Sequence, residues 1–269
     1  MSAAPIGIFD SGMGGLTVMR ALKARLPGES YIYLGDTARL PYGTKSADTV
    51  TRYAVQASTA LLRQGVKLLV VACNTASAAA VPTLQAAFAP LPVVGVIEPG
   101  ARAAVTTAAG GPIAFIATEG TVKGGAYVRA IQNIAPNMPV VQQACPLFVA
   151  LAEEGLRDGP IVELIARRYL EPLLATAPKP RALVLGCTHF PVLKEAVAQV
   201  AGADVALVDS AQTTAEAVEA ILNERNLRNT GDAVPSRFLA TDAPARFAHL
   251  GEYFLGEAID PSRVTLVDL

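Results

Sequence analysis

The stretch LLVVACNTA, residues 68–76, joins a strand-forming run to a cysteine. Its first half is uninterruptedly apolar, which is typical of parallel strands that helices cover on both faces. The run ends at Cys73, and two polar residues follow at once. ALVLGCTHF, residues 182–190, repeats this arrangement around Cys187. Because ligands of parallel sheets bind at the carboxyl ends of the strands, both cysteines are candidate site residues.

Ten short apolar runs alternate with longer, alanine-rich segments of helical periodicity. This alternation predicts an α/β fold in which mostly parallel sheets are flanked by helices. The predicted strands cover residues 5–9, 30–35, 67–72, 92–96, 112–117, 139–143, 182–186, 204–208, 236–241 and 262–267.

Two motifs occur twice, in the same order. IGIFDSGMGG (6–15) is similar to IAFIATEGTV (113–122), and the stretch around Cys73 is similar to the stretch around Cys187. The two copies of each motif are separated by nearly equal lengths of chain. This repetition predicts two pseudo-symmetric α/β lobes.

The composition excludes several classes of protein. The chain has 269 residues, a net charge of −1 and 22 scattered basic residues, so it lacks the basic field that nucleic acids or membrane surfaces require. No apolar run is long enough for a membrane helix, and the N-terminus has no signal-peptide pattern. Three cysteines, Cys73, Cys145 and Cys187, do not form a disulfide framework. We therefore expect a soluble, cytoplasmic protein.

Four loops place polar residues after predicted strands, at residues 10–12, 73–75, 118–121 and 187–189. Each loop is expected to lead into a helix N-terminus, where free N–H groups favour a substrate carboxylate or a thiolate. A helix N-terminus also lowers the pKa of a thiol, which makes each cysteine of these loops a candidate general base. Cys145 lacks polar followers and is interpreted as a packing residue.

The glycine-rich turn permits a second interpretation. Gly12, Gly14 and Gly15 approach a dinucleotide-binding fingerprint, and Asp36 follows the second strand where a ribose-binding acid would stand. Thr17 occupies the third glycine position, and the charge of the preceding aspartate opposes a pyrophosphate. A simple tight turn explains the glycines equally.

Three further features leave alternatives open. The ARLPYG segment (38–43) is either a surface turn or a loop that lowers Tyr42 and Gly43 onto a ligand. His189 could orient a thiol, whereas His249 is interpreted as a packing or helix-surface residue. The two cysteines and His189 could bind zinc, but their neighbours add no natural fourth ligand, so we expect no metal.

The ordered set of motifs from Ile6 to Asp209 resembles the bacterial glutamate racemase family of the aspartate/glutamate racemase superfamily. The segments that carry the resemblance are GIFDSGMGGLTV, PYG, VVACNTAS, GVIEPG, ATEGTV, CPLFVALAEEG and LGCTHFPVL. The sequence departs from the usual pattern of this family at Phe190, where tyrosine is more common. It also departs at Ala150 and Ala152, which replace bulkier residues near Glu153.

The resemblance implies an isomerase that interconverts L- and D-glutamate without pyridoxal phosphate or a metal, and so supplies D-glutamate for peptidoglycan, cell-wall biogenesis and cell shape. It implies a homodimer with no nucleic-acid or membrane partner. It also implies an active site between the lobes, with residues 1–97 and 210–269 in the first lobe and 98–209 in the second. Because only five residues precede Ile6, we expect no activation by a cell-wall precursor.

By resemblance, Cys73 and Cys187 carry out proton transfer on opposite faces of the substrate. Asp10 matches the partner of Cys73, and Glu153 and His189 match the partners of Cys187. The implied substrate-binding residues are Asp10, Ser11, Tyr42, Gly43, Asn74, Thr75, Thr118, Thr121, Thr188 and His189.

Three alternatives remain at this stage. The first is a two-cysteine racemase that acts on aspartate, hydantoins or another small acid. The second is a nucleotide-binding or regulatory α/β module with incidental cysteines. The third is a dicarboxylate-binding protein without catalytic activity.

Overall fold

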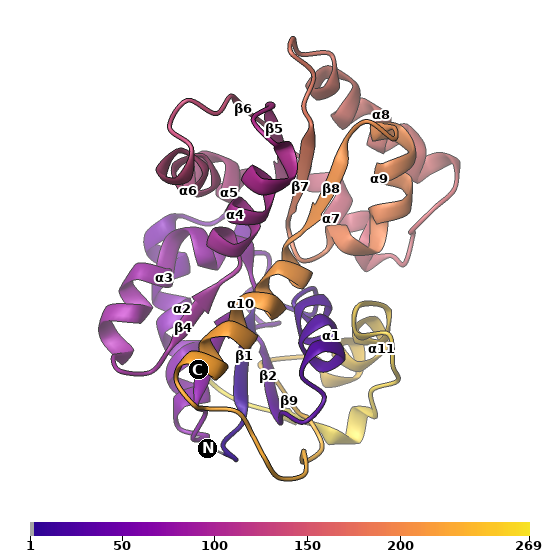
Figure 1. The fold of residues 1–269 in the computed structure, drawn as a ribbon. Helices are drawn as coiled ribbons and strands as arrows, with labels where there is room; N and C mark the ends of the chain where they lie inside the picture. Colours follow the sequence, from indigo (N-terminus) through magenta and orange to yellow (C-terminus); the bar gives the residue numbers. More distant parts are fainter. Residues whose placement is uncertain (1–2) are drawn as a thin grey trace.

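The computed structural model describes residues 3–269 and contains two parallel sheets (Figure 1). The six-stranded sheet has the order β10-β9-β2-β1-β3-β4, and the four-stranded sheet has the order β6-β5-β7-β8. All ten predicted strands are present, with ends within two residues of the expected ones. They are β1 (Ile6–Asp10), β2 (Tyr31–Gly35), β3 (Leu68–Val71), β4 (Val93–Gly95), β5 (Ile113–Ala117), β6 (Val140–Ala144), β7 (Ala182–Gly186), β8 (Ala206–Asp209), β9 (Arg237–Ala240) and β10 (Val264–Leu266).

Helices cover both faces of each sheet, which confirms the predicted α/β class. They are α1 (Leu16–Arg25), α2 (Ala47–Leu62), α3 (Asn74–Phe88), α4 (Ile97–Ala108), α5 (Glu119–Gly124), α6 (Ala126–Ile134), α7 (Pro146–Glu153), α8 (Pro160–Leu174), α9 (Lys194–Ala201), α10 (Ser210–Glu224) and α11 (Pro244–Leu255). Three short 3₁₀ helices complete the set: η1 (Tyr42–Thr44), η2 (Phe190–Leu193) and η3 (Pro261–Arg263).

The two sheets share one topology. The order β2-β1-β3-β4 in the larger sheet matches β6-β5-β7-β8 in the smaller one, so the repeated sequence motifs occupy equivalent strands, β1 with β5 and β3 with β7. We call the six-stranded sheet with its helices the first lobe and the four-stranded sheet with its helices the second lobe. Figure 1 shows α10 running between the lobes, where it packs against α1 and α4.

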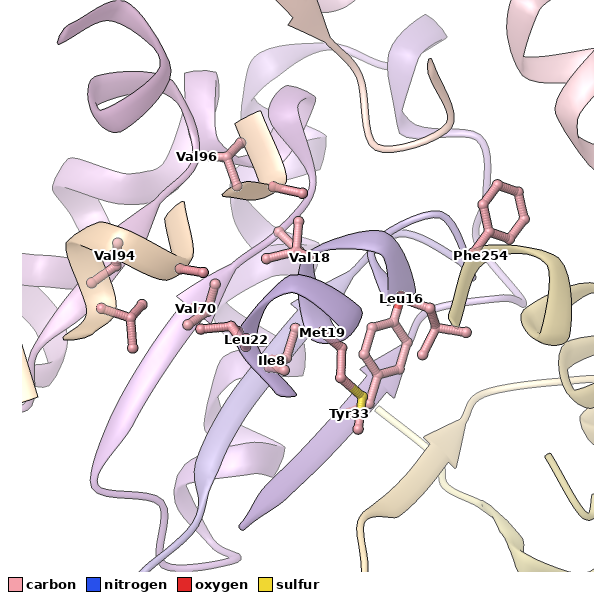
Figure 2. Packing of buried hydrophobic residues seen from close by; sticks show 14 of the residues in the cluster. Ile8, Leu16, Val18, Met19, Leu22, Tyr33, Val70, Val94, Val96 and Phe254 are labelled. Carbon is pink, nitrogen blue, oxygen red and sulfur yellow. The ribbon is translucent and has the colours of Figure 1, made fainter. Parts of the chain in front are cut away.

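The core of the first lobe explains why its strands form. Ile8 and Val70 are fully buried on neighbouring strands, and Leu22 of α1 packs over them (Figure 2). Removing such a side chain from water contributes about 1.5–3 kcal/mol. The opposite face of the same sheet packs against α2 and α3, so the strands are apolar on both sides, as the uninterrupted runs predict.

The loops after the strands differ in how they meet the helices. Cys73 caps α3, because its sulfur accepts the N–H of Ala76 at 3.4 Å, and Thr118 caps α5 in the same way. The expected helix N-terminus directly after Cys187 is wrong. The Phe190 N–H bonds the Cys187 carbonyl at 3.0 Å, and the chain makes one 3₁₀ turn, η2, before α9 begins.

No helix within residues 3–269 has the length and apolar character that crossing a bilayer requires.

Candidate active site

Cys73 lies at the carboxyl end of β3 and is only 5% exposed. Its thiol donates to Ser11 Oγ at 3.5 Å. Burial, and next the charge of Asp10, raise the pKa of Cys73 to about 12, against the weaker effect of the α3 N–H group. The expected lowering by the helix N-terminus is therefore wrong for this thiol, because desolvation outweighs the helix end. Cys73 is a protonated thiol at neutral pH.

Asp10 stands beside this thiol, at the end of β1, and is fully buried. Its Oδ2 accepts the Gly12 N–H at 3.0 Å, and burial raises the pKa of the carboxyl group. A Cβ on Gly15 would lie 2.6 Å from the Asp10 Cβ, so the glycine allows the turn to fold against the aspartate. Asp10 Oδ1 is buried and has no hydrogen-bond partner within residues 3–269.

Cys187 belongs to a three-residue chain in the second lobe. Its sulfur lies 3.8 Å from His189 Nδ1, and His189 Nε2 lies 3.2 Å from Glu153 Oε1. Burial alone would lower the pKa of His189, but its bonds to Cys187 and Glu153 raise it to about 10. The same bond lowers the pKa of Glu153. An imidazolium at neutral pH thus donates toward the sulfur, and Glu153 reaches Cys187 only through it.

The two cysteine loops approach each other across the lobes. A Cβ on Gly14, in the turn after Asp10, would lie 2.6 Å from the His189 ring and from Thr188 Oγ1, and the charge of His189 lowers the pKa of Asp10 against the larger effect of burial. Thr17 Oγ1 in the first lobe donates to the Thr188 carbonyl at 3.0 Å. The two cysteine loops therefore face each other in one buried region.

Three threonine hydroxyl groups form a cluster that also joins the lobes. Thr75 Oγ1 of α3 lies 2.9 Å from Thr118 Oγ1 and 3.3 Å from Thr121 Oγ1, and the latter two are 3.1 Å apart. The backbone of Gly43 approaches so closely that a Cβ there would lie 2.9 Å from the Thr118 Cβ. This cluster joins the N-terminal ends of α3 and α5, where an anion is favoured.

A buried network holds the loop that carries Tyr42. The Asp36 carboxylate, which is fully buried, accepts hydrogen bonds from Arg39 at 2.7 Å, from Thr241 at 3.0 Å and from the Tyr42 hydroxyl. These three partners occupy the carboxylate. Asp36 therefore anchors its own loop, and the ribose-binding interpretation of this residue finds no support.

Replacing Asp36 with asparagine tests this anchor. Asp36→Asn leaves Arg39 without its carboxylate, so we expect the free energy of unfolding to fall by about 1–3 kcal/mol. Chemical denaturation measures the change, with Asp204→Asn as a matched control on an exposed residue. A loss below about 0.5 kcal/mol, the usual effect of a surface substitution, would contradict the anchor.

The His189 pair predicts a pH-dependent stability. The pKa of His189 rises from 6.5 in the unfolded chain to about 10 in the folded one, so its contribution is full below pH 6.5 and is lost as the pH rises towards 10. The difference in unfolding free energy between wild type and His189→Gln should therefore shrink over this range, by at most about 1.4 kcal/mol per pH unit. Denaturation at several pH values measures it, and a constant difference would refute it.

The loops that carry the sequence-predicted site residues meet in this region, with Tyr42 bonded to Asp36 and its neighbour Gly43 against Thr118. His249 and Cys145 lie apart from it: His249 is exposed on α11, and Cys145 is buried in the second lobe with its thiol directed to the Gln143 carbonyl at 3.7 Å. No group of three or more histidine, cysteine or acidic side chains among residues 3–269 could hold a metal ion.

Sequence reasoning missed Tyr127, whose hydroxyl accepts a hydrogen bond from Asn74 at 2.8 Å, and missed the anchoring role of Asp36. Tyr127 is the second residue of α6, in a stretch of ordinary composition, so no local signal marks it. Asp36 could have been found from its position directly before the Tyr42 loop.

Fold and site together define a two-lobed α/β protein with paired buried thiols where the lobes meet. The model of the Asp/Glu/Hydantoin racemase family matches residues 6–218. The chain belongs to this family.

Known proteins resemble the chain over nearly its whole length. Glutamate racemase from Geobacter metallireducens is 50% identical over 252 residues, which cover 93% of this chain and 92% of the relative. The structure of glutamate racemase from Francisella tularensis in complex with D-glutamate has a TM-score of 0.92 and 38% identity, and covers 100% of this chain and 98% of that one. The structure of glutamate racemase isoform RacE1 from Bacillus anthracis has a TM-score of 0.93 and 37% identity, and covers 99% of this chain and 98% of that one.

Proposed function

We propose that this protein racemises glutamate, with Cys73 and Cys187 as the two proton-transferring groups. The observation that carries the proposal is the position of two buried thiols at equivalent strand ends of two similar lobes, whose loops touch through Thr17 and Thr188. Family membership and the full-length similarity to glutamate racemases support the substrate assignment.

The surroundings of Cys73 suit the α-ammonium group of an amino acid. Asp10 Oδ1 and Asn74 Oδ1 are both buried acceptors without a partner among residues 3–269. An orphaned buried acceptor costs about 1–3 kcal/mol, and a ligand with N–H donors relieves that cost. The hydroxyl groups of Thr75, Thr118 and Thr121, at the ends of α3 and α5, suit a carboxylate.

The proposed reaction needs one thiolate and one thiol. The thiolate removes the Cα hydrogen as a proton, the C–H electron pair stays on the substrate as a planar carbanion, and the opposite thiol delivers its proton to the other face. Cys73 is set as the proton-bearing partner in the resting state, and the imidazolium of His189 supplies a hydrogen bond for a thiolate at Cys187. The thiols exchange these roles when the reaction reverses.

Positioning and electrostatic stabilisation both lower the barrier of the proposed proton transfer. Holding both thiols and the substrate in line contributes on the order of 7–11 kcal/mol to such a step. The carbanion gains stabilisation from donors that are already oriented in a site that excludes water. The imidazolium of His189, held by Glu153, and the threonine hydroxyl groups are such donors, and Asp10 accepts from the ammonium group. As the family resemblance implies, the proposed reaction uses no pyridoxal phosphate or metal.

We also infer a biological setting and an assembly. The D-glutamate formed would enter peptidoglycan synthesis in the cytoplasm, in keeping with the family resemblance. A homodimer is proposed on the same ground, and exposed apolar residues such as Ile161 and Leu164 of α8 leave surface for it. We keep the proposed domain boundaries at 97/98 and 209/210, and they are supported by sheet membership, which changes between β4 and β5 and again between β8 and β9.

A substrate panel tests the assignment. Each enantiomer of glutamate, aspartate and alanine is incubated with the protein, and circular dichroism follows the loss of optical activity. L-glutamate and D-glutamate should both lose optical activity until they reach the same racemic mixture, and far faster than aspartate or alanine. Faster turnover of aspartate than of glutamate would make aspartate the assigned substrate. Binding of glutamate without turnover would favour a non-catalytic binding protein.

A further inference from the structure

Tyr127 of α6 contacts the sequence neighbours of both thiols. Its side chain is fully buried, and its hydroxyl accepts the Nδ2–H of Asn74, the residue after Cys73, at 2.8 Å. A Cβ on Gly186, the residue before Cys187, would lie 3.1 Å from the Tyr127 ring. One second-lobe side chain thus touches both cysteine loops.

The Tyr127 hydroxyl lies where α4 and α10 meet. A Cβ on Gly100 of α4 would lie 3.4 Å from this hydroxyl oxygen and 3.8 Å from the Cβ of Ser210 on α10. On its other side, toward the Cys73 loop, the same oxygen accepts the Asn74 Nδ2–H.

This hydrogen bond fixes the orientation of the Asn74 amide. Because Nδ2 is held by Tyr127, the acceptor atom Oδ1 occupies the other side, where it is buried and has no partner within residues 3–269. An amide without such a restraint can turn over and exchange its donor and acceptor sides at little cost.

We propose that Tyr127 is a positioning residue that makes the site selective for a ligand with an α-ammonium group. It acts through Asn74, by keeping an acceptor oxygen rather than an N–H group toward the ligand. The inference rests on the proposed function, in which glutamate binds beside Cys73. Without the Tyr127 hydroxyl, the Asn74 amide can turn its N–H groups toward the ligand. These groups repel the ammonium group of the ligand but leave the binding of its carboxylates unaffected.

The test compares Tyr127→Phe with Tyr31→Phe. Tyr31 is a matched control: it is also buried, and its hydroxyl bonds the Leu22 and Leu26 carbonyls, away from both cysteine loops. The KM of glutamate should rise roughly tenfold in Tyr127→Phe, since hydrogen bonds to charged groups are strong. The inhibition constant of glutarate, which lacks the ammonium group, should change less than about twofold. Tyr31→Phe should leave both values unchanged.

A double variant separates a role through Asn74 from a general structural role. In an Asn74→Ala background, adding Tyr127→Phe should have no further effect on KM, because residues that act through one another are not additive.

The outcomes separate the alternatives. Equal weakening of glutamate and glutarate binding would show a purely structural role and overturn the inference, as would additivity with Asn74→Ala or an unchanged KM. Wild-type protein that fails to racemise glutamate would instead overturn the proposed function, and this inference with it.

Discussion

Replacing Cys73 or Cys187 with alanine is expected to abolish racemisation of glutamate in both directions. Either variant keeps only one proton-transferring group, and a single group cannot both remove a proton from one face and return one to the other. We expect a loss of at least roughly 10³-fold, within the range that a positioned acid or base contributes. Circular dichroism with each enantiomer as substrate measures it.

The chain contains its own control for this experiment. Cys145 is a third buried thiol, in the core of the second lobe, and has no place in the proposed reaction. Cys145→Ala should therefore keep the wild-type rate within a few-fold. Substantial racemisation by either of the other two alanine variants would contradict the two-thiol account.

Gly14→Ala is expected to reduce turnover about 100-fold while the protein stays folded. A Cβ at Gly14 would lie 2.6 Å from the His189 ring and from Thr188 Oγ1 across the lobe contact. His189 cannot move away freely, since Cys187 and Glu153 hold it on both sides. Either the imidazole or the second lobe must shift, and a displacement of about 1 Å is enough for a loss of this size. Steady-state kinetics and thermal unfolding measure the two effects.

Gly28→Ala is the matched control. A Cβ at Gly28 meets no atom within 4 Å, so the same substitution there should leave turnover unchanged. Wild-type activity in Gly14→Ala would show that the lobes do not need this close contact during catalysis.

The sequence predicts most of the fold because the decisive signals are local. Buried parallel strands require uninterrupted apolar runs, and each of the ten runs forms a strand. The repeated motifs predict the equivalence of β1 with β5 and of β3 with β7, since the same strand position requires the same pattern. The turn after Cys187 was not predictable in the same way, because one 3₁₀ turn leaves no periodicity.

The sequence is less informative about the chemistry of the site. Strand ends locate the cysteine loops, but the pKa of Cys73 depends on burial and on Asp10, which no neighbour in sequence reveals. Glu153 reaches Cys187 through His189, and only the folded chain shows this order. Tyr127 acts on the loop of Cys73 from the other lobe, so its role depends on long-range packing.

The most direct measurement of the central claim is the destination of solvent deuterium during the first turnovers. L-glutamate is incubated in deuterated water, and mass spectrometry with chiral separation reads the label in each enantiomer before equilibrium. Two opposed thiols predict D-glutamate that carries one deuterium at Cα, while the remaining L-glutamate stays unlabelled. D-glutamate that retains its original hydrogen, or equal early labelling of both enantiomers, would show a single proton-transferring group and contradict the account.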